Sequence, residues 1–292
     1  MKHFVMFAFA ACSSVALAAY DVQLVQAGLN RPYGIEVVGG GDGARVYFTQ
    51  LPTPGVPGSM GGMNSVNLRR PNGTLSIISM GEPDPLHLSF SQGNLFWTCR
   101  SAGVILRAQP NGSIAPVLTG LMRPTGVEAG PHGSLYFTQV PTPGVPGSMG
   151  GMNTVNVLFG NVTTVLTTGE PEPTDIAVDP RTGTAYWTCK SAGVILSRNR
   201  CGTVSLFLSG LSQPNGIDTD ERGNLFFTEV PTPGLSGSMG GMNKVWKVRI
   251  RDRAMTLVNA GDPEPNDISV SQSGAIYWTC TSAGVIVRAV PR

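Results

Sequence analysis

Residues 214–229 read PNGIDTDERGNLFFTE, and the pattern in this stretch predicts the architecture of the whole chain. It combines a short strand that begins with Pro-x-Gly, a turn around Gly223, and a second strand that ends in aromatic-x-Thr. The second element recurs six times along the chain, at Tyr47, Phe96, Tyr136, Tyr186, Phe226 and Tyr277. Paired short strands that recur at regular intervals indicate an all-β repeat protein.

A longer repeat groups these elements in pairs. Pro-Thr-Pro-Gly begins at Pro52, Pro141 and Pro231, so the period is about 90 residues. After each aromatic element comes an alternating strand, a turn such as Asn111-Gly112, and another short strand. Four strands per half-unit and six half-units predict a six-bladed β-propeller made of three tandem two-blade repeats.

The two ends of the chain complement each other. The last half-unit stops at residues 290–292, after its third strand, and lacks a fourth. Residues 22–27 match the fourth strand of other units, for example residues 204–209. We therefore expect the N-terminal strand to complete the last blade, which would leave no open sheet edge.

The chain begins with a stretch typical of export. Residues 1–18 combine a short positive start, an apolar segment and an Ala-x-Ala cleavage site, which predicts a signal peptide followed by a single domain over 19–292. The sequence thus predicts a secreted protein, with glycosylation at the sequons of Asn72, Asn111 and Asn161. The remaining charge is close to neutral, so we expect neither nucleic acid nor a membrane as a partner. The oligomeric state stays open.

The Pro-x-Gly-Ile and aromatic-x-Thr patterns resemble the blades of NHL-type, gluconolactonase, strictosidine-synthase and streptogramin-lyase propellers. The likeness covers the whole mature chain, but it is architectural. Gluconolactonase-like enzymes hold a divalent metal at the x of Pro-x-Gly, and Asn215 matches a ligand position there. The acidic partners are missing, so the resemblance keeps the metal as an alternative only. The six residues at x are Tyr33, Leu86, Thr125, Thr174, Asn215 and Asn266.

One position further along, every second blade carries a titratable residue. These residues are His87, Asp175 and Asp267, whereas the other blades have Gly34, Gly126 and Gly216. An imidazole and two carboxylates near the axis predict a catalytic or ligand-anchoring group. The alternative is that the two Asp side chains bond the backbone of local turns. Strand alternation would let only one of the two adjacent rings point fully inward.

The loop that follows each Pro-Thr-Pro-Gly contains Ser-Met-Gly-Gly-Met-Asn and should lie beside the starts of the innermost strands. We expect these loops to wall a substrate site whose floor includes Tyr33, Asn215 and Asn266. Simple packing and binding of Cu(I) by thioethers are the alternatives. The methionines concerned are Met60, Met63, Met149, Met152, Met239 and Met242.

The cysteines of the mature chain occupy positions that cannot pair easily. Cys99, Cys189 and Cys280 are equivalent in the repeat, and Cys201 lies one strand away at the opposite face. A strand of roughly eight residues spans about 25 Å, whereas a disulfide needs Cα atoms within about 7 Å. We therefore predict four free thiols, which act as small apolar side chains rather than as nucleophiles.

Known catalytic signatures for hydrolases, phosphate binding, zinc and dinucleotides are absent from the sequence. In size, signal peptide, sequons and doubled blades, the chain resembles secreted fungal hetero-Diels–Alderases that act in terpenoid and polyketide-like secondary metabolism. The resemblance implies a cofactor-independent ring-forming enzyme for small apolar ligands, which works mainly by orientation. Two alternatives stay open: a metal-dependent lactone hydrolase with a divalent cofactor, and a non-catalytic propeller that binds a ligand or a protein.

Overall fold

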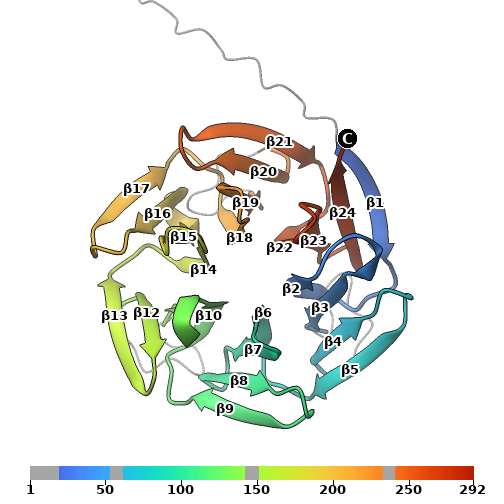
Figure 1. Ribbon diagram of the computed structural model, residues 1–292, viewed down its shortest axis with the longest axis horizontal. Coiled ribbons are helices and arrows are strands. Elements are labelled where there is room, and N and C mark those ends of the chain that lie inside the picture. The colour runs from blue at the N-terminus through green and yellow to red at the C-terminus, as the bar shows by residue number, and fades with distance from the viewer. Residues whose placement is uncertain (1–19, 53–61, 142–150, 233–240) are drawn as a thin grey trace, which may run out of the picture.

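The computed structural model describes residues 20–52, 62–141, 151–232 and 241–292. Its strands form six antiparallel four-stranded sheets around a central channel, which confirms the six-bladed propeller (Figure 1). From the channel outward, blades 1–3 are β2 (Pro32–Val38), β3 (Arg45–Gln50), β4 (Ser65–Arg69) and β5 (Leu75–Met80); β6 (Pro85–Ser91), β7 (Asn94–Cys99), β8 (Val104–Ala108) and β9 (Ile114–Leu118); and β10 (Pro124–Ala129), β11 (Leu135–Gln139), β12 (Thr154–Phe159) and β13 (Val162–Thr168).

Blades 4–6 continue the same order. They are β14 (Pro173–Val178), β15 (Ala185–Cys189), β16 (Val194–Arg198) and β17 (Val204–Leu208); β18 (Pro214–Thr219), β19 (Asn224–Glu229), β20 (Lys244–Arg249) and β21 (Ala254–Ala260); and β22 (Pro265–Val270), β23 (Ile276–Cys280), β24 (Val285–Pro291) and β1 (Tyr20–Gln26). Short 3-10 turns are the only helical elements in the described ranges, and none of them could cross a membrane.

The last blade closes as predicted. β1 pairs antiparallel with β24, with Val22 opposite Ala289 and Leu24 opposite Val287. The first and last strands therefore lie in one sheet, at the point where blade 6 meets blade 1 (Figure 1). Because the N-terminal strand supplies the missing fourth strand, the ring of blades closes through ordinary ladder hydrogen bonds.

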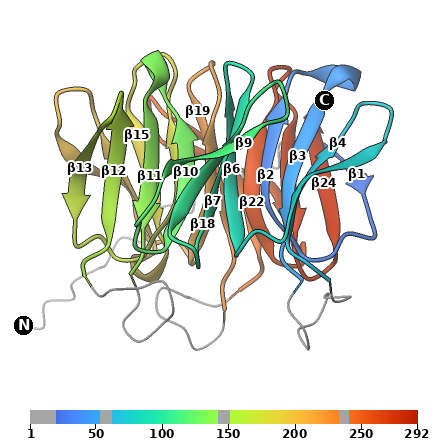
Figure 2. The same ribbon diagram turned by 90° about the horizontal axis from the view of Figure 1, so that it is seen from below.

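Every inner strand runs away from the same face of the propeller. The six prolines that begin these strands lie at this end, which we call the mouth, and the strands lead to the opposite end of the channel, the far end (Figure 2). The core lies between neighbouring sheets, where Trp97, Trp187 and Trp278 are fully buried. The aromatic residues of the repeat therefore hold the blades together, and the channel side of the inner strands is left for polar groups.

A bulge interrupts the pairing of each inner strand directly after its proline. In blade 4, for example, the register shifts between Pro173 and Ile176, and the other five blades shift at the equivalent place. The Thr of the aromatic-x-Thr element fixes this bulge. The Oγ1 of Thr188 accepts a hydrogen bond from Asp175 N at 3.2 Å and donates one to Asn215 O of the next blade at 2.7 Å. The repeated Thr thus joins two blades at the level of the site.

Candidate functional site

The structure brings His87, Asp175 and Asp267 together on the channel axis, as the sequence predicted. The Nδ1 atom of His87 lies 3.2 Å from Oδ1 of Asp175 and 3.4 Å from Oδ2 of Asp267. All three side chains are buried. The ring nitrogen is an ion-pair partner of both carboxylates, but it lacks the alignment of a conventional hydrogen bond with either. One imidazole is therefore held between two carboxylates from blades 4 and 6.

Glycine in the odd blades makes this approach possible. A Cβ atom built on Gly126 would lie 2.7 Å from Asp175 Cα, and one built on Gly216 would lie 2.6 Å from Asp267 Cα. Both separations are far inside van der Waals contact with backbone atoms. The alternation of Gly with His or Asp around the axis is thus a packing requirement of the site.

Both carboxylates also accept hydrogen bonds from the next blade. Ile217 N donates to Oδ2 of Asp175 at 2.9 Å, and Ile35 N donates to Oδ2 of Asp267 at 2.8 Å. The other oxygen of Asp267 accepts a bond from Ile268 N at 2.9 Å. The alternative of purely local turn bonding is therefore incomplete, because the main contacts cross from one blade to its neighbour. These bonds orient the two carboxylates toward His87.

The electrostatic balance of the trio favours a charged imidazole. Burial opposes protonation of His87, but the carboxylates of Asp175 and Asp267 outweigh it and raise the pKa of His87 well above its ordinary value. Burial raises the pKa of Asp175, although the adjacent His87 lowers it. The two carboxylates therefore favour the protonated form of the imidazole, whose Nδ1 faces them.

His87 lines a cavity of about 160 Å³ at the mouth. The ring of Tyr33 packs edge-on against the imidazole of His87, with ring centroids 5.7 Å apart and planes at 88°. The wall is mostly polar, whereas the sequence had suggested an apolar, methionine-lined site. It consists of Tyr33, Leu86, His87, Arg100, Arg123, Thr125, Val140, Glu172, Thr174, Lys190 and Asn215.

The residues at the x of Pro-x-Gly share the cavity with His87, which strand alternation alone would forbid. Tyr33, Thr125, Thr174 and Asn215 line it, together with Leu86. The physical reason is the bulge after each proline, which lets consecutive residues face the channel. Asn266 lies behind this wall. Its backbone oxygen accepts a 2.7 Å hydrogen bond from Nδ2 of Asn215.

The expected methionine wall is not part of this cavity. Met63, Met152 and Met242 are each 63% exposed and do not line it. Met60, Met149 and Met239 lie outside the described residues. The described methionines therefore give no support to a role in binding.

Sequence reasoning missed the residue that precedes each inner-strand proline. All six have φ near +50°, a strained left-handed conformation that costs on the order of 1–3 kcal/mol each. Two of them, Arg123 and Glu172, line the mouth cavity. Comparison of the repeats would have located this position, because its residue varies while the following proline does not. The six are Arg31, Asp84, Arg123, Glu172, Gln213 and Glu264.

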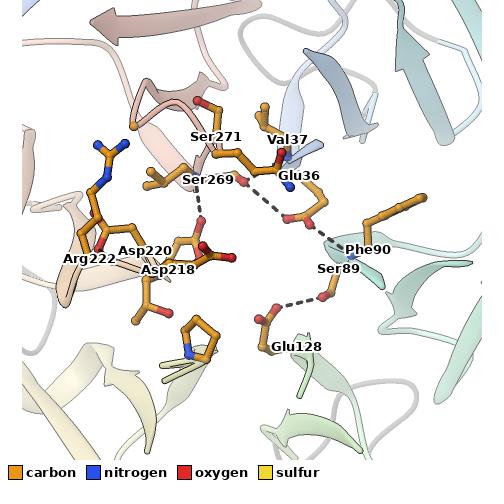
Figure 3. A pocket seen from close by; sticks show the side chains of 16 residues that line it. Glu36, Val37, Ser89, Phe90, Glu128, Asp218, Asp220, Arg222, Ser269 and Ser271 are labelled. Carbon is orange, nitrogen blue, oxygen red and sulfur yellow. Dashed lines mark hydrogen bonds between the residues drawn. The ribbon is translucent and has the colours of Figure 1, made fainter. Parts of the chain in front are cut away.

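The far end of the channel holds a second cavity, of about 460 Å³, which the sequence did not predict. Glu36, Glu128 and Asp218 face it from the odd blades (Figure 3). Ser89 Oγ donates to Glu128 at 2.8 Å, and Val270 N donates to Asp218 at 2.7 Å. Burial and mutual repulsion raise the pKa of Glu36 and of Glu128 well above their ordinary range. Burial raises that of Asp218 to about 7.

The four cysteines of the described chain are free, as predicted. Cys99, Cys189 and Cys280 are buried in three different blades, and Cys201 is exposed at a hairpin turn. Burial raises the pKa of Cys99 and of Cys189 to about 12. A thiol with such a pKa is almost entirely protonated at neutral pH, which agrees with a packing role rather than a nucleophilic one.

Comparison with solved structures places the propeller among several functional classes. A gluconolactonase of Xanthomonas campestris superimposes with a TM-score of 0.74 at 14% identity, over 96% of this chain and 93% of that one. A streptogramin B lyase superimposes with a TM-score of 0.61 at 15% identity, over 94% of this chain and 98% of that one. A chain of a nidogen/laminin complex superimposes with a TM-score of 0.62 at 16% identity, over 80% of this chain and 83% of that one. No family model and no curated protein sequence matches the chain. At these identities the likeness shows the fold alone.

The divalent metal that gluconolactonase-like propellers imply does not fit the residues present. Ligand atoms of His87, Asp175 and Asp267 do lie within 4.8 Å of one another. However, both oxygens of Asp267 accept backbone N–H bonds, and those of Asp175 face His87 and Ile217 N. The position at x supplies amides and hydroxyls but no carboxylate. A hard cation would therefore find only two carboxylates, both already engaged with backbone N–H groups and with His87, where it prefers several oxygen ligands.

Proposed function

We propose that the chain is a small-molecule enzyme whose active site is the mouth cavity around His87. One observation carries the proposal: a buried imidazole lies between two carboxylates and also lines a cavity. Such an imidazolium is a preorganised hydrogen-bond donor at neutral pH. Its natural target is the carbonyl oxygen of a bound substrate, because the donated bond withdraws electron density from that oxygen.

The reaction that we propose is a hetero-Diels–Alder-type cycloaddition. An enone supplies four atoms and an alkene supplies two; one C–O and one C–C bond form, and three π bonds become one. No proton, electron or leaving group is exchanged, so this chemistry requires no nucleophile or cofactor. Orientation can supply up to roughly 7–11 kcal/mol, and the hydrogen bond from His87 lowers the barrier further. Asp175 and Asp267 act as positioning residues that keep His87 charged.

The test is a cycloaddition assay on an enone with an alkene partner, with and without a chelator. We expect rate acceleration and stereochemical control that persist in the chelator. His87→Gln should lower kcat by about 10²–10⁴-fold because the charged donor is lost. Arg31→Gln, at a mouth position outside the cavity wall, serves as the control. Product ratios equal to those of the uncatalysed reaction for every enone–alkene pair would contradict the proposal.

The lactone hydrolase is the second candidate; because the residues present do not fit its divalent metal, it rests on the buried Oδ1 of Asn215 alone. This oxygen has no hydrogen-bond partner among the described residues, and Asn215 matches a ligand position of gluconolactonase-like propellers. The hydrolase predicts that an aldonolactone is opened, that a chelator abolishes this activity, and that a divalent ion restores it. The same pair of assays therefore separates the two reactions.

We further propose that the protein is exported and carries glycans away from the mouth. Asn72, Asn111 and Asn161 are exposed and lie on the turns that join the third and fourth strands of blades 1–3. Because the third strands begin at the mouth, these turns lie at the opposite face. Expression through a eukaryotic secretory pathway should give a mass that falls on treatment with peptide N-glycosidase. A protein with no change in mass would contradict the glycan assignment.

A further inference from the structure

Positive charge is gathered on one side of the mouth cavity. Arg100, Arg123 and Lys190 line it from blades 2, 3 and 4, and Glu172 is the only acidic residue in the described wall. The repeat itself does not require these charges. Blade 6 has Thr281 at the position of Arg100 and Lys190, and blade 5 has Gln213 at the position of Arg123. The three cations of the cavity wall thus come from three consecutive blades, whereas Arg31 of blade 1, at the position of Arg123, does not line the cavity.

The two arginines lie close enough to repel each other. Burial lowers the pKa of Arg123, the nearby guanidinium of Arg100 lowers it further, and Asp84 offsets part of this effect. The Nε atom of Arg100 is buried with no hydrogen-bond partner in the described chain. Its ion pair with Asp84 is long, at 3.7 Å. A ligand anion would relieve the repulsion and supply an acceptor to the guanidinium of Arg100.

Asn215, which also lines the cavity, carries an unused acceptor. Asn215 is 1% exposed, and its Oδ1 atom is buried with no partner among the residues described. The Nδ2 atom donates to Asn266 O at 2.7 Å, which fixes the orientation of the amide. A buried carbonyl oxygen without a donor is unfavourable by about 1–3 kcal/mol. A hydroxyl group of a ligand would satisfy it.

The size of the cavity limits what can enter. At about 160 Å³ it is smaller than the roughly 300–1,000 Å³ that holds a drug-sized molecule. Only a compact part of the substrate, the polar head with the carbonyl at His87, can occupy it, and the rest of the ligand must extend outward. The head must present an anion to Arg100, Arg123 and Lys190, and a hydroxyl donor to Asn215.

Building on the proposed function, we propose that the substrate class is hydroxycarboxylates, bound by their head group in this cavity. The carboxylate lies against the cations of blades 2–4, and the adjacent hydroxyl donates to Oδ1 of Asn215. This assignment gives the site a direction, because the cations and Asn215 bind different parts of the head. It also orients the remainder of the substrate toward the rim.

Three probes test the head group by binding, independently of turnover. Mandelate carries both features, phenylacetate lacks the hydroxyl, and mandelamide lacks the anion. NMR titration of the full mature chain should show that mandelate binds at least about tenfold more tightly than either analogue, which corresponds to about 1.4 kcal/mol. Mandelate binding no tighter than mandelamide binding would overturn the proposal.

The repeat supplies substitutions that the fold already tolerates. Arg123→Gln copies Gln213, Lys190→Thr copies Thr281, and Asn215→Thr copies Thr125 and Thr174. The first two substitutions should weaken the binding of mandelate and of phenylacetate about tenfold and leave the affinity for mandelamide unchanged. Asn215→Thr should remove only the tighter binding of mandelate relative to phenylacetate. At the equivalent position, Oγ1 of Thr174 bonds Thr188 and Asn215 O between two blades, and a Thr at position 215 would be engaged in the same way instead of accepting from the ligand hydroxyl.

Arg31→Gln is the matched control, since Arg31 precedes an inner-strand proline as Arg123 does but does not line the cavity. It should leave all three affinities unchanged. An equal loss in Arg31→Gln and Arg123→Gln would overturn the proposal, because it would indicate a general charge effect. Tight mandelate binding without any ring-forming activity would refute the proposed function and leave the head-group assignment standing. Catalysis of ring formation with neutral substrates, without mandelate binding, would refute the head-group assignment and leave the proposed function standing.

Discussion

The two ends of the channel are built from the same six inner strands but hold opposite chemistry. At the mouth, the carboxylates of Asp175 and Asp267 share a cationic partner, His87, and both are fixed by backbone N–H groups of the next blade. At the far end, Glu36, Glu128 and Asp218 meet around a larger cavity, and Arg222 is the only cation among the described residues that line it. One repeat thus places carboxylates against a buried imidazole at one end and against one another at the other end.

The two ends should also respond differently to the loss of a carboxylate. A paired, buried ion costs a great deal to disturb, because removal of one partner leaves the other desolvated. An unpaired carboxylate beside a solvent-filled cavity is already partly relieved by protonation and by water. Mutations at the two ends should therefore differ in sign as well as in size.

The largest effect is expected from Asp267→Ala. The substitution removes one partner of His87 and leaves Ile35 N without its acceptor, so the free energy of unfolding should fall by about 3–5 kcal/mol. Urea denaturation followed by tryptophan fluorescence measures the change. Glu128→Ala at the far end is the control and should change stability by less than about 1 kcal/mol. Equal losses at both ends would remove the distinction between them.

A smaller effect is expected where the glycines make room for the trio. Gly216→Ala would place Cβ 2.6 Å from Asp267 Cα and 2.8 Å from its Oδ1, so blade 6 must shift. Overpacking of this kind costs about 1–3 kcal/mol. Gly43→Ala, where no atom lies within 4 Å of the added Cβ, is the control and should be close to neutral. A neutral Gly216→Ala would show that the site tolerates a wider spacing.

The smallest effect concerns the pH dependence of stability. The pKa of Asp218 rises from 3.8 to about 7 in the folded state, so the folded chain binds more protons than the unfolded chain between these values. Its contribution to stability is therefore present at acidic pH and is lost as the pH rises toward 7. Raised pKa values at Glu36 and Glu128 act in the same direction.

Asp218→Asn should remove part of this dependence. It should increase the free energy of unfolding at pH 8 by about 1 kcal/mol, after allowance for screening by solvent in the cavity, and have little effect at pH 4. Urea titrations at the two pH values measure the difference. A variant that is less stable than the parent at pH 8 would show that the hydrogen bonds from Val270 and Thr219 outweigh the charge.

The architecture is predictable from the sequence, because the signals for it are local and repeated. The aromatic-x-Thr element gives the strands and the blade count, and the missing fourth strand at the C-terminus predicts the pairing of β1 with β24. It also placed His87, Asp175 and Asp267 near the axis, since equivalent positions of a closed repeat must meet there.

Which atoms meet and which charges are paired could not be predicted from the sequence and follows from the folded ring. The bulge after each inner-strand proline lets Asn215 and His87 line one cavity, which strand alternation would not predict. The cations of the mouth and the carboxylates of the far end come from separate blades, and their grouping depends on how the blades turn around the axis. Pairing, desolvation and the direction of a pKa shift depend on distances of a few ångströms between residues far apart in the chain, and such distances exist only once the ring has closed.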